Sequence, residues 1–389
     1  VSRLPPGSLA TLSKDGIDIE DIFTHNFERY QQLETPTVSD LHTFFMQGCK
    51  NRCSDEFDTL ISLSGGMDSR GVAAGIAEID PDAQAVSFVT GEGASVRDAE
   101  LAKQISEKLD IAWKPFDVSG GANYRQQLLQ MEFGMNSLEM APLIEYAERV
   151  AEEYNSPFLL TGNGGDKIFP DLTPSRSFDS LSELARWAVS ENSRLDSQIV
   201  EQITDVSREE LVSSVKERLD EYPEESFTQK YVHFLIRERG FNWLNHGEER
   251  YRNLIWTDTP FYAPKLFRNA MAIPPKEKKS GSLYVNILEK MSNNVLSVPD
   301  AMFNAPPKSF QFKAKRQIYE VLDAHPLIKQ IILKMVKDNS QTATTTIPRS
   351  IEREVRDVIT HQQMPGLTSA MQIYTLKLLS DCTNERFGK

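Results

Sequence analysis

The sequence predicts an α/β fold: a doubly wound parallel sheet with a mainly helical C-terminal lobe. Three observations predict it. Short β-prone runs alternate with helical stretches between residues 58 and 162, which is typical of parallel strands joined by crossover helices. After about Pro174 no comparable strand signal recurs, and amphipathic helices dominate. With 389 residues the chain exceeds what one hydrophobic core usually serves, so we expect one large lobed domain or two domains.

The predicted elements follow in order along the chain. The first is an apolar run with helical periodicity, with Ser39 or Asp40 at its N-cap. Strands are expected at residues 59–63, 85–89, 111–118 and 157–161. The helices expected in this half lie at residues 38–47, 69–78, 98–109 and in a zone around 144–151. Amphipathic helices are expected further on, at residues 181–190, 207–219 and 231–244. Ser207 and Glu210 form a capping box before the second of these.

Three regions follow from this pattern. Residues 1–40 are rich in turn formers and acidic residues and hold no long periodic segment, so they are expected to be a leading arm. Residues 41–175 hold the alternating strands and helices of the α/β core. Residues 176–389 are expected to form the helical lobe and to pack onto the sheet.

Composition and charge exclude several classes of protein. With 40% hydrophobic and 25% charged residues, the chain is neither collagen-like, nor disordered, nor a disulfide scaffold. No stretch approaches the roughly 18 apolar residues of a membrane span, and the start lacks the apolar core of a signal peptide. The net charge of -13 argues against broad contact with nucleic acid. We therefore expect a cytoplasmic protein with no membrane or nucleic-acid partner.

The cysteines carry little chemical signal. There are three in the chain, an odd and sparse count that fits a reducing compartment. Cys49 and Cys53, with His42 nearby, lack the four ligands and the tighter spacing of a zinc site. We expect both to be small buried hydrophobic side chains.

The strongest chemical signal is the segment Ser64–Ser69 (SGGMDS), placed between a strand and a helix. Two glycines let the backbone approach a phosphate closely, and the helix that follows offers unpaired N–H groups. Asp68 in such an anion-binding turn requires a cation, most simply Mg²⁺. Because ligands of doubly wound sheets bind beyond the carboxyl ends of the strands, chemistry is expected at the turns after Leu63 and Thr161.

The Ser64–Ser69 segment resembles the pyrophosphate-binding loop (PP-loop) of the N-type ATP pyrophosphatases, which cleave ATP between its α and β phosphates to adenylylate a substrate. Further stretches are similar to the asparagine synthetase branch of that superfamily: Leu160–Phe169 (LTGNGGDKIF), Asp98-Ala99 followed by Ala102, and Val298–Phe310 (VPDAMFNAPPKSF). Leu4–Ser8 (LPPGS) matches the junction after the glutaminase domain of full-length members, so the arm at 1–40 is expected to be a remnant of it.

The resemblance implies an adenine nucleotide alpha hydrolase-like fold with ATP and Mg²⁺ as cofactors. It implies that Asp68 and Asp166 hold Mg²⁺ and that Lys308 acts in catalysis by neutralising the leaving pyrophosphate. Contacts to the nucleotide or its pyrophosphate are expected from Leu63, Ser64, Gly65, Gly66, Asp68, Ser69, Val86, Ser87 and Gly162.

The sequence departs from the asparagine synthetase pattern around the acceptor. Asn163 stands where a glutamate usually manages protons during attack of the amine, and Lys167 stands where another acid is usual. β-Lactam synthetase-like members use a carboxylate of the helical lobe instead. Glu238 lies in roughly that region and is a candidate catalytic base, with an exposed helical ion pair as the equal alternative. The usual Pro-Phe-Leu-Asp sequence appears as Pro260–Ala263 (PFYA), without its aspartate.

A second departure concerns nitrogen. Full-length asparagine synthetases release ammonia with an N-terminal cysteine, and here no cysteine precedes Cys49. We therefore expect a synthetase domain without a functional glutaminase domain. Either an upstream domain or a glutaminase partner supplies ammonia, or the nucleophile is another amine, as in β-lactam and lasso-peptide cyclisation.

The sequence thus predicts an ATP-dependent, AMP-forming carbon–nitrogen ligase. It would adenylylate a small-molecule or peptide carboxylate and form an amide with ammonia or another amine donor, and a homodimer is one expected assembly. Within enzymes the alternatives are an intramolecular amide-forming cyclase and a tRNA-modifying or thiolating enzyme. From another class, the alternative is a non-catalytic nucleotide-binding subunit.

Overall fold

The computed structural model describes residues 4, 7–91, 94–132, 136–323, 349–359 and 367–387. Its centre is a five-stranded sheet in the order β5-β4-β3-β6-β7, with every neighbouring pair parallel. The strands are β3 (Asp58–Ser62), β4 (Gln84–Val89), β5 (Ala112–Asp117), β6 (Pro157–Leu160) and β7 (Trp256–Asp258). The predicted α/β class with a parallel sheet is confirmed.

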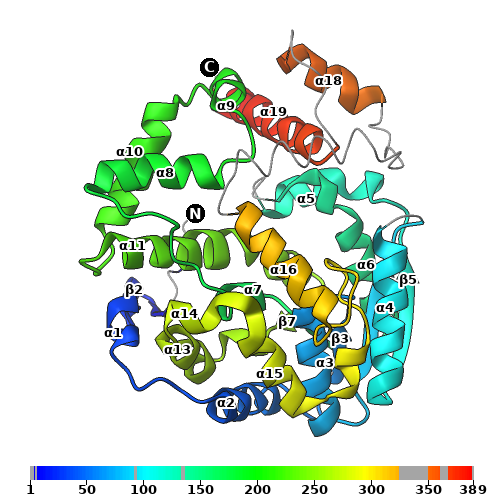
Figure 1. Ribbon diagram of the computed structural model, residues 1–389. Coiled ribbons are helices and arrows are strands. Elements are labelled where there is room, and N and C mark those ends of the chain that lie inside the picture. Colours follow the sequence, from blue (N-terminus) through cyan, green and yellow to red (C-terminus); the bar gives the residue numbers. More distant parts are fainter. Residues whose placement is uncertain are drawn as a thin grey trace.

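Both faces of the sheet are covered, as a doubly wound fold requires. Alternate strand residues point to opposite faces. Ile61 packs with α2 (Val38–Lys50), α3 (Met67–Ile79) and α4 (Ala94–Leu109) in one core. Leu60 packs in a second core with Tyr146 and Val150 of α6 (Pro142–Glu153). The sheet is therefore buried between two helical layers, seen in Figure 1 around β3.

The fifth strand corrects the sequence prediction. No strand was expected after about Pro174, yet β7 pairs with β6 through Phe158↔Trp256 and Leu160↔Asp258. A three-residue edge strand has no room for a hydrophobic period, so local sequence carries no signal for it. The C-terminal half therefore contributes an edge strand to the sheet in addition to its helices.

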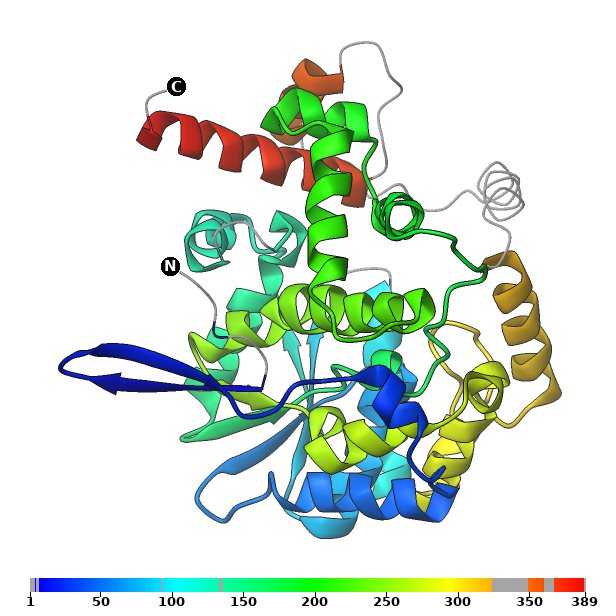
Figure 2. The same cartoon turned by 90° about the vertical axis from the view of Figure 1, so that its left-hand side faces the viewer.

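The N-terminal arm also holds regular structure that the sequence interpretation did not contain. β1 (Ser8–Ser13) and β2 (Gly16–Asp21) form an antiparallel hairpin that projects from the body in Figure 2. The short helix α1 (Phe27–Gln31) follows and buries Phe27 and Tyr30. Nearly every residue of the hairpin is exposed, so its strands lack the run of buried residues that the central strands of the sheet show.

Helices make up the rest of the described chain. In the order of the sequence they are α5 (Arg125–Glu132), α7 (Gly165–Ile168), α8 (Leu181–Asn192), α9 (Ser197–Thr204), α10 (Arg208–Asp220), α11 (Phe227–Phe234), the π-helix η3 (Leu235–Leu244), α12 (His246–Arg252), α13 (Pro264–Ala272), α14 (Pro275–Lys278), α15 (Ser282–Met291), α16 (Phe310–Asp323), α18 (Arg349–Ile359) and α19 (Leu367–Phe387). Single 3₁₀ turns lie at Ala122–Tyr124, Leu138–Met140, Pro260–Tyr262, Lys279–Gly281 and Asn294–Ser297.

One sequence prediction for the caps of these helices is confirmed and one is wrong. Ser207 and Glu210 form the expected capping box at the start of α10. The N-cap of α2 is Thr37 rather than Ser39 or Asp40, because Thr37 and Asp40 form a capping box in which Asp40 is the third helical residue. Helices α18 and α19 pack against α9 and Leu138 in a separate core, above the sheet in Figure 1. Within the described ranges, no helix is long and apolar enough to cross a membrane.

Candidate functional site

The two glycine-rich turns lie at the same edge of the sheet because they follow neighbouring parallel strands. β3 pairs with β6 in the register Ile61↔Leu160, so both strands end at one level. The first turn then leads into α3 and the second into α7. The structure therefore brings together Ser64–Ser69 and Gly162–Asp166, which are about a hundred residues apart in sequence.

The first turn is held in shape by its own hydroxyls. Ser69 Oγ accepts the N–H of Ser64 at 3.1 Å and lies 3.0 Å from Ser64 Oγ, while the N–H of Gly66 points to Ser64 Oγ at 3.3 Å. Gly66 is the N-cap of α3 and caps it with no side chain. The first N–H groups of α3 are therefore not taken by a cap, and with the helix dipole they form an anion site.

The first of the two loop glycines is required by close packing. A Cβ on Gly65 would lie 2.5 Å from Leu101 Cδ1 and 3.0 Å from Ala301 Cβ, whereas Gly66 meets nothing nearer than Ser64 Oγ at 3.4 Å. The N–H of Gly65 also donates to the carboxylate of Asp98. Gly65 thus locks the loop against α4 and the segment after residue 298, and Gly66 leaves space on the ligand side.

The second turn touches the first directly. A Cβ on Gly162 would lie 2.6 Å from the backbone nitrogen of Ser69, and one on Gly165 would overlap Oδ1 of Asp68. The N–H of Asp166 donates to the Asp68 carboxylate. The two predicted metal carboxylates are therefore adjacent, and only glycine at positions 162 and 165 allows this approach.

The electrostatics of this pair fit a cation. Burial, and next the nearby Asp166 carboxylate, raise the pKa of Asp68 to about 7; a hydrogen bond from Tyr284 and the charge of Lys167 oppose the rise. Lys167 pairs with Asp166, whose side chain stays half exposed. Mg²⁺ is commonly held by one or two carboxylates together with substrate phosphates. Asp68 and Asp166 fit that role, and no larger cluster of metal-ligating side chains lies in the described part of the chain.

Tyr284 of α15 is a site residue that the sequence interpretation missed. Its hydroxyl hydrogen-bonds the Asp68 carboxylate and lies 3.2 Å from the Met67 carbonyl oxygen. Its ring stacks on Phe169 at 4.4 Å, and a Cβ on Gly71 would lie 2.9 Å from its hydroxyl. No local motif marks Tyr284, because it reaches the site from a helix more than 200 residues away.

Arg70 fastens the loop from inside. It is fully buried, and its guanidinium donates to the carbonyls of Val295 (2.9 Å), Val298 (2.7 Å), Pro299 (2.9 Å) and Gly65 (3.1 Å). Burial lowers its pKa to about 10. Arg70 therefore ties the PP-loop to the segment that leads to Lys308, a role that a single arginine in a helical sequence does not reveal.

The residues predicted to line the nucleotide are at the same edge but differ in what they offer. Ser87 Oγ donates to the Leu63 carbonyl at 2.6 Å and accepts from Trp113 Nε1 at 3.0 Å. The Val86 side chain is fully buried in the core with Tyr146. Leu63 and Val86 are joined by a backbone hydrogen bond of 2.9 Å. Val86 can thus present only backbone to a ligand on the opposite face.

The two predicted catalytic residues form neither a hydrogen bond nor an ion pair with Asp68 or Asp166. Lys308 Nζ contacts Glu289 Oε1 at 2.6 Å and Asn293 Oδ1 at 3.2 Å, at the surface beside α15. Glu238 accepts from Tyr222 at 2.9 Å and Asn242 at 2.7 Å, with Arg218 at 3.4 Å. The structure therefore places both of them outside the carboxylate pair.

Around Asn163 the structure shows unsatisfied polar groups. The amide nitrogen of its side chain and the hydroxyl of Tyr262 are buried without a hydrogen-bond partner among the described residues. The Tyr262 ring lies over Gly164, where an added Cβ would be 2.7 Å from the ring. Burial, and next the charge of Asp166, raise the pKa of Tyr262. Asn163 is one of the departures from the asparagine synthetase pattern, and Tyr262 directly precedes Ala263, where the usual aspartate is missing. Buried polar groups of this kind call for a ligand or water.

A helical-lobe carboxylate is joined to Asn163 by hydrogen bonds, and it is not Glu238. The N–H of Asn163 points to Thr161 Oγ1 at 3.3 Å, and Thr161 donates to Glu248 Oε1 at 2.5 Å. Glu248 lies on α12 and is 3% exposed. Burial raises its pKa, against the hydrogen bonds from Thr161 and Thr257.

The outer side of the site is basic and aromatic. Burial, and next the charge of Arg194, lower the pKa of Arg239, while Tyr231 and Asp166 oppose the change. Its guanidinium donates to Asn192 at 3.0 Å. Arg239 and Arg194 lie 5.5 Å and 5.8 Å from the ring centroid of Trp243. Arg239 and Trp243 belong to η3, and π-helical segments are frequent at functional sites.

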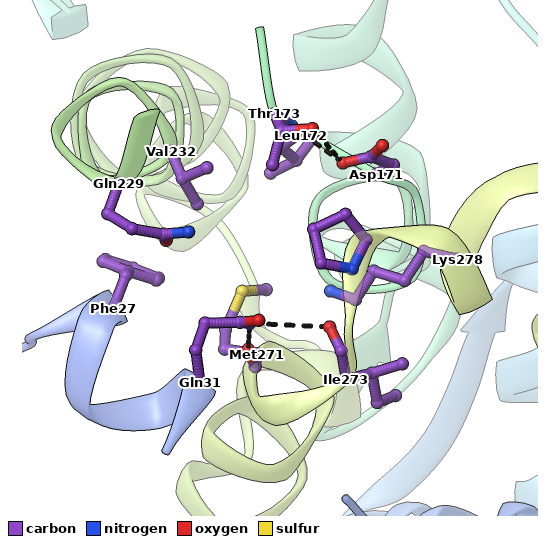
Figure 3. A pocket seen from close by; sticks show the side chains of 11 residues that line it. Phe27, Gln31, Asp171, Leu172, Thr173, Gln229, Val232, Met271, Ile273 and Lys278 are labelled. Atoms are coloured by element: carbon purple, nitrogen blue, oxygen red, sulfur yellow. Dashed lines mark hydrogen bonds between the residues drawn. The ribbon is translucent and has the colours of Figure 1, made fainter. Parts of the chain in front are cut away.

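Figure 3 shows a small cavity of about 20 Å³ lined in part by Asp171, Leu172 and Thr173, which follow α7 in the sequence. Lys278 lines it, and its Nζ donates to the carbonyl of Ile168 at 2.8 Å, at the end of α7. Burial lowers the pKa of Lys278 to about 7, while Asp171 opposes the change. The volume of the cavity, about 20 Å³, suits one water molecule. Lys278 therefore supports the helix that carries Asp166 rather than facing a substrate.

The cysteines lie away from this site. Cys49 is buried, Cys53 is half-buried, and both are free thiols. Cys49 packs against Gly75, where an added Cβ would lie 2.9 Å from Cys49 Sγ. Cys53 Sγ donates to the Cys49 carbonyl at 3.5 Å.

Comparison with known proteins agrees with this geometry. The family model for asparagine synthase matches residues 45–369, which include both glycine-rich turns, Tyr284 and Lys308. No glutaminase domain is matched in the chain. No curated protein matches the sequence. The matched region spans most of the chain, and the chain belongs to the asparagine synthase family.

Proposed function

We propose that the protein uses MgATP to activate a carboxylate as its acyl-adenylate and then converts it to an amide. The observation that carries the proposal is the contact between the two turns, which sets Asp68 beside Asp166 in front of the uncapped N-terminus of α3. Family membership supports ATP-dependent amide-forming chemistry in general. The substrate is not fixed by that membership.

In the first step a carboxylate oxygen attacks the α-phosphorus, the bond to the bridging oxygen breaks, and pyrophosphate leaves. Catalysis of such a step is mainly positioning and neutralisation of charge. The N–H groups at the start of α3 bind the leaving phosphates, and Gly66 leaves them space. Mg²⁺, held by Asp68 and Asp166, would supply further positive charge. Lys308 contributes once it exchanges Glu289 for pyrophosphate.

In the second step an amine attacks the acyl carbon, AMP leaves, and the amine gives up a proton. Asn163 cannot accept that proton as a glutamate would. Glu238 lies apart from the carboxylate pair, whereas Glu248 is linked to Asn163 through Thr161. We propose that Glu248 rather than Glu238 influences this side of the site, with Tyr262 binding the acceptor or the amine.

The source of nitrogen and the assembly belong to the same proposal. Ammonia from a glutaminase partner or domain, or an amine within the substrate itself as in cyclisation, would each complete the reaction. The unsatisfied Asn163 and Tyr262 favour an acceptor that differs from the usual one, which keeps the cyclase alternative open. A cytoplasmic location and a homodimer remain part of the prediction.

The test is pyrophosphate release from MgATP across a panel of carboxylates, with and without ammonia. The panel contains aspartate, other amino-acid derivatives, uronic acids and peptides. Asp68→Ala is compared with Asp82→Ala, an exposed aspartate on a turn remote from the site. We expect release that depends on one class of acid and is lost in Asp68→Ala alone. ATP binding with no release across the whole panel would favour a nucleotide-binding subunit instead.

A further inference from the structure

A second cavity is lined by Ile236, Arg237 and Phe241 of η3. Its volume is about 240 Å³. It is enclosed by the connector between β2 and α1, by the turn after α10, and by α11 with η3, which come together beside α1 in Figure 1. Its lining residues are Asp21, Phe23, Thr24, His25, Phe27, Glu221, Tyr222, Pro223, His233, Ile236, Arg237 and Phe241. We call it the His25 cavity.

The walls of the His25 cavity are flat and aromatic. The Tyr222 ring stacks on His233 at 4.0 Å with an interplanar angle of 6°. His25 packs edge-on against Phe23 at 4.9 Å, and its ring centroid lies 6.1 Å from that of Phe241. Such walls favour a planar apolar ligand over a flexible polar one.

Most polar groups around the cavity already have partners. His233 Nδ1 lies 3.0 Å from Glu224, and His25 Nδ1 lies 3.0 Å from the Tyr30 hydroxyl. Of the two acids at the rim, Asp21 accepts from Ser8 at 2.7 Å and Glu221 pairs with Arg218 at 2.6 Å. These groups therefore already have hydrogen-bond partners within the protein.

Arg237 is the exception. Its side chain is 31% exposed, and its Nε is buried without a hydrogen-bond partner among the described residues. The nearest carboxylate oxygen, Oε1 of Glu238, is 4.0 Å away and is used by Tyr222 at 2.9 Å. The buried Nε is out of reach of a ligand, but the two terminal nitrogens of Arg237 form no hydrogen bond with the described residues. These two nitrogens, beside aromatic walls, are suited to a planar carboxylate, which they can bind with two parallel hydrogen bonds.

We propose that the His25 cavity is a binding site for a small aromatic carboxylate, held by Arg237 and stacked between Tyr222 and Phe241. This inference does not rest on the proposed ligase activity, because it concerns binding alone. The cavity is nevertheless coupled to the site: Phe241 packs on Tyr262 at 4.9 Å, and Tyr262 covers Gly164 of the second turn. A ligand here is placed to alter the acceptor side, either as part of a substrate or as an effector.

The test is isothermal titration of the whole chain with phenylacetate and with two analogues: phenylacetamide, which lacks the charge, and cyclohexylacetate, whose ring is not aromatic. We expect saturable binding of phenylacetate, with at least tenfold weaker binding of phenylacetamide and several-fold weaker binding of cyclohexylacetate. Arg237→Gln should weaken phenylacetate at least tenfold. Arg208→Gln, an exposed arginine on α10, and Asp68→Asn should change it less than twofold.

Two controls keep the result decisive. Arg237→Gln must retain the thermal unfolding midpoint of the wild type, and Arg237→Lys should keep part of the affinity because the charge remains. No saturable binding by the wild type, or equal loss in Arg237→Gln and Arg208→Gln, would overturn the proposal. If phenylacetate binds, its effect on pyrophosphate release separates the two sources: a consumed ligand is substrate, and an unconsumed one that changes the rate is an effector.

Discussion

The side of the site that we propose binds phosphate (the phosphate side) and the side that we propose binds the acceptor (the acceptor side) are built differently. On the phosphate side, Gly162 and Gly165 are required because the Ser69 backbone and Asp68 approach too closely for a side chain, and Gly65 is required because Leu101 and Ala301 do. On the acceptor side, Asn163 and Tyr262 leave buried polar atoms without partners among the described residues. The first region is fixed by backbone contacts and so repeats as a sequence motif. The second is fixed by side chains that can change with the substrate.

The largest effect is expected from the buried fastening of the phosphate side. Arg70→Met would leave carbonyls of Gly65, Val295, Val298 and Pro299 without a donor, which costs on the order of 3–5 kcal/mol of unfolding free energy. Denaturant unfolding measures it, with the exposed Arg208→Met as control. A loss below about 1 kcal/mol would show that the Arg70 bonds do not hold this side together.

Next in size is the contact between the two turns. Gly165→Ala places a Cβ on Asp68 Oδ1 and must displace one of the two carboxylates proposed to hold Mg²⁺. We expect pyrophosphate release to fall roughly 100-fold, as when a positioned charge is lost from an active site. Gly91→Ala is the matched control for added bulk, because no atom of the described residues lies within 4 Å of the added Cβ; its φ of +48° adds some strain of its own. Equal activity of Gly165→Ala and the wild type would mean that the two turns need not touch.

The carboxylate pair also predicts a pH dependence. With the pKa of Asp68 raised to about 7, the folded metal-free chain holds more protons than the unfolded chain between about 3.8 and 7. Its stability therefore falls as pH rises through that window. Mg²⁺ competes with the same proton, so Mg²⁺ affinity in the presence of ATP should drop up to about tenfold per pH unit below 7.

Mg²⁺ titrations at pH 5.5, 6.5, 7.5 and 8.5 measure this dependence. Asp68→Asn should remove it together with most of the affinity, whereas the exposed Asp82→Asn should leave it unchanged. An affinity that is flat across pH 5.5 to 7.5 in the wild type would contradict the raised pKa of Asp68.

The smallest effect on stability is expected from Tyr262→Phe, which should affect the acceptor side and not the phosphate side. Tyr262→Phe removes a buried hydroxyl that has no partner among the described residues, so stability should stay the same or rise by up to about 1 kcal/mol. Pyrophosphate release should change less than twofold, while amide formation falls by a larger factor. Thermal unfolding and a two-step assay test this, and an equal fall in both steps would place Tyr262 on the phosphate side instead.

The sequence by itself determined the phosphate side. A short strand, two glycines and a helix with an aspartate in its first turn form a local pattern, so Ser64–Ser69 and Gly162–Asp166 could be recognised and both were found at one sheet edge. The parallel order of the strands followed from their alternation with helices. These features are local in sequence, and local features leave local signals.

Only the tertiary structure decided the rest. Tyr284 and Glu248 reach the site from distant helices, β7 joins the sheet from the C-terminal half, and Lys308 and Glu238 are engaged by Glu289 and Tyr222. The identity of a lysine or glutamate says nothing of its partner, because exposed charges pair with whatever the packing brings near them. Long-range packing alone determines which charges face Asp68 and which face solvent.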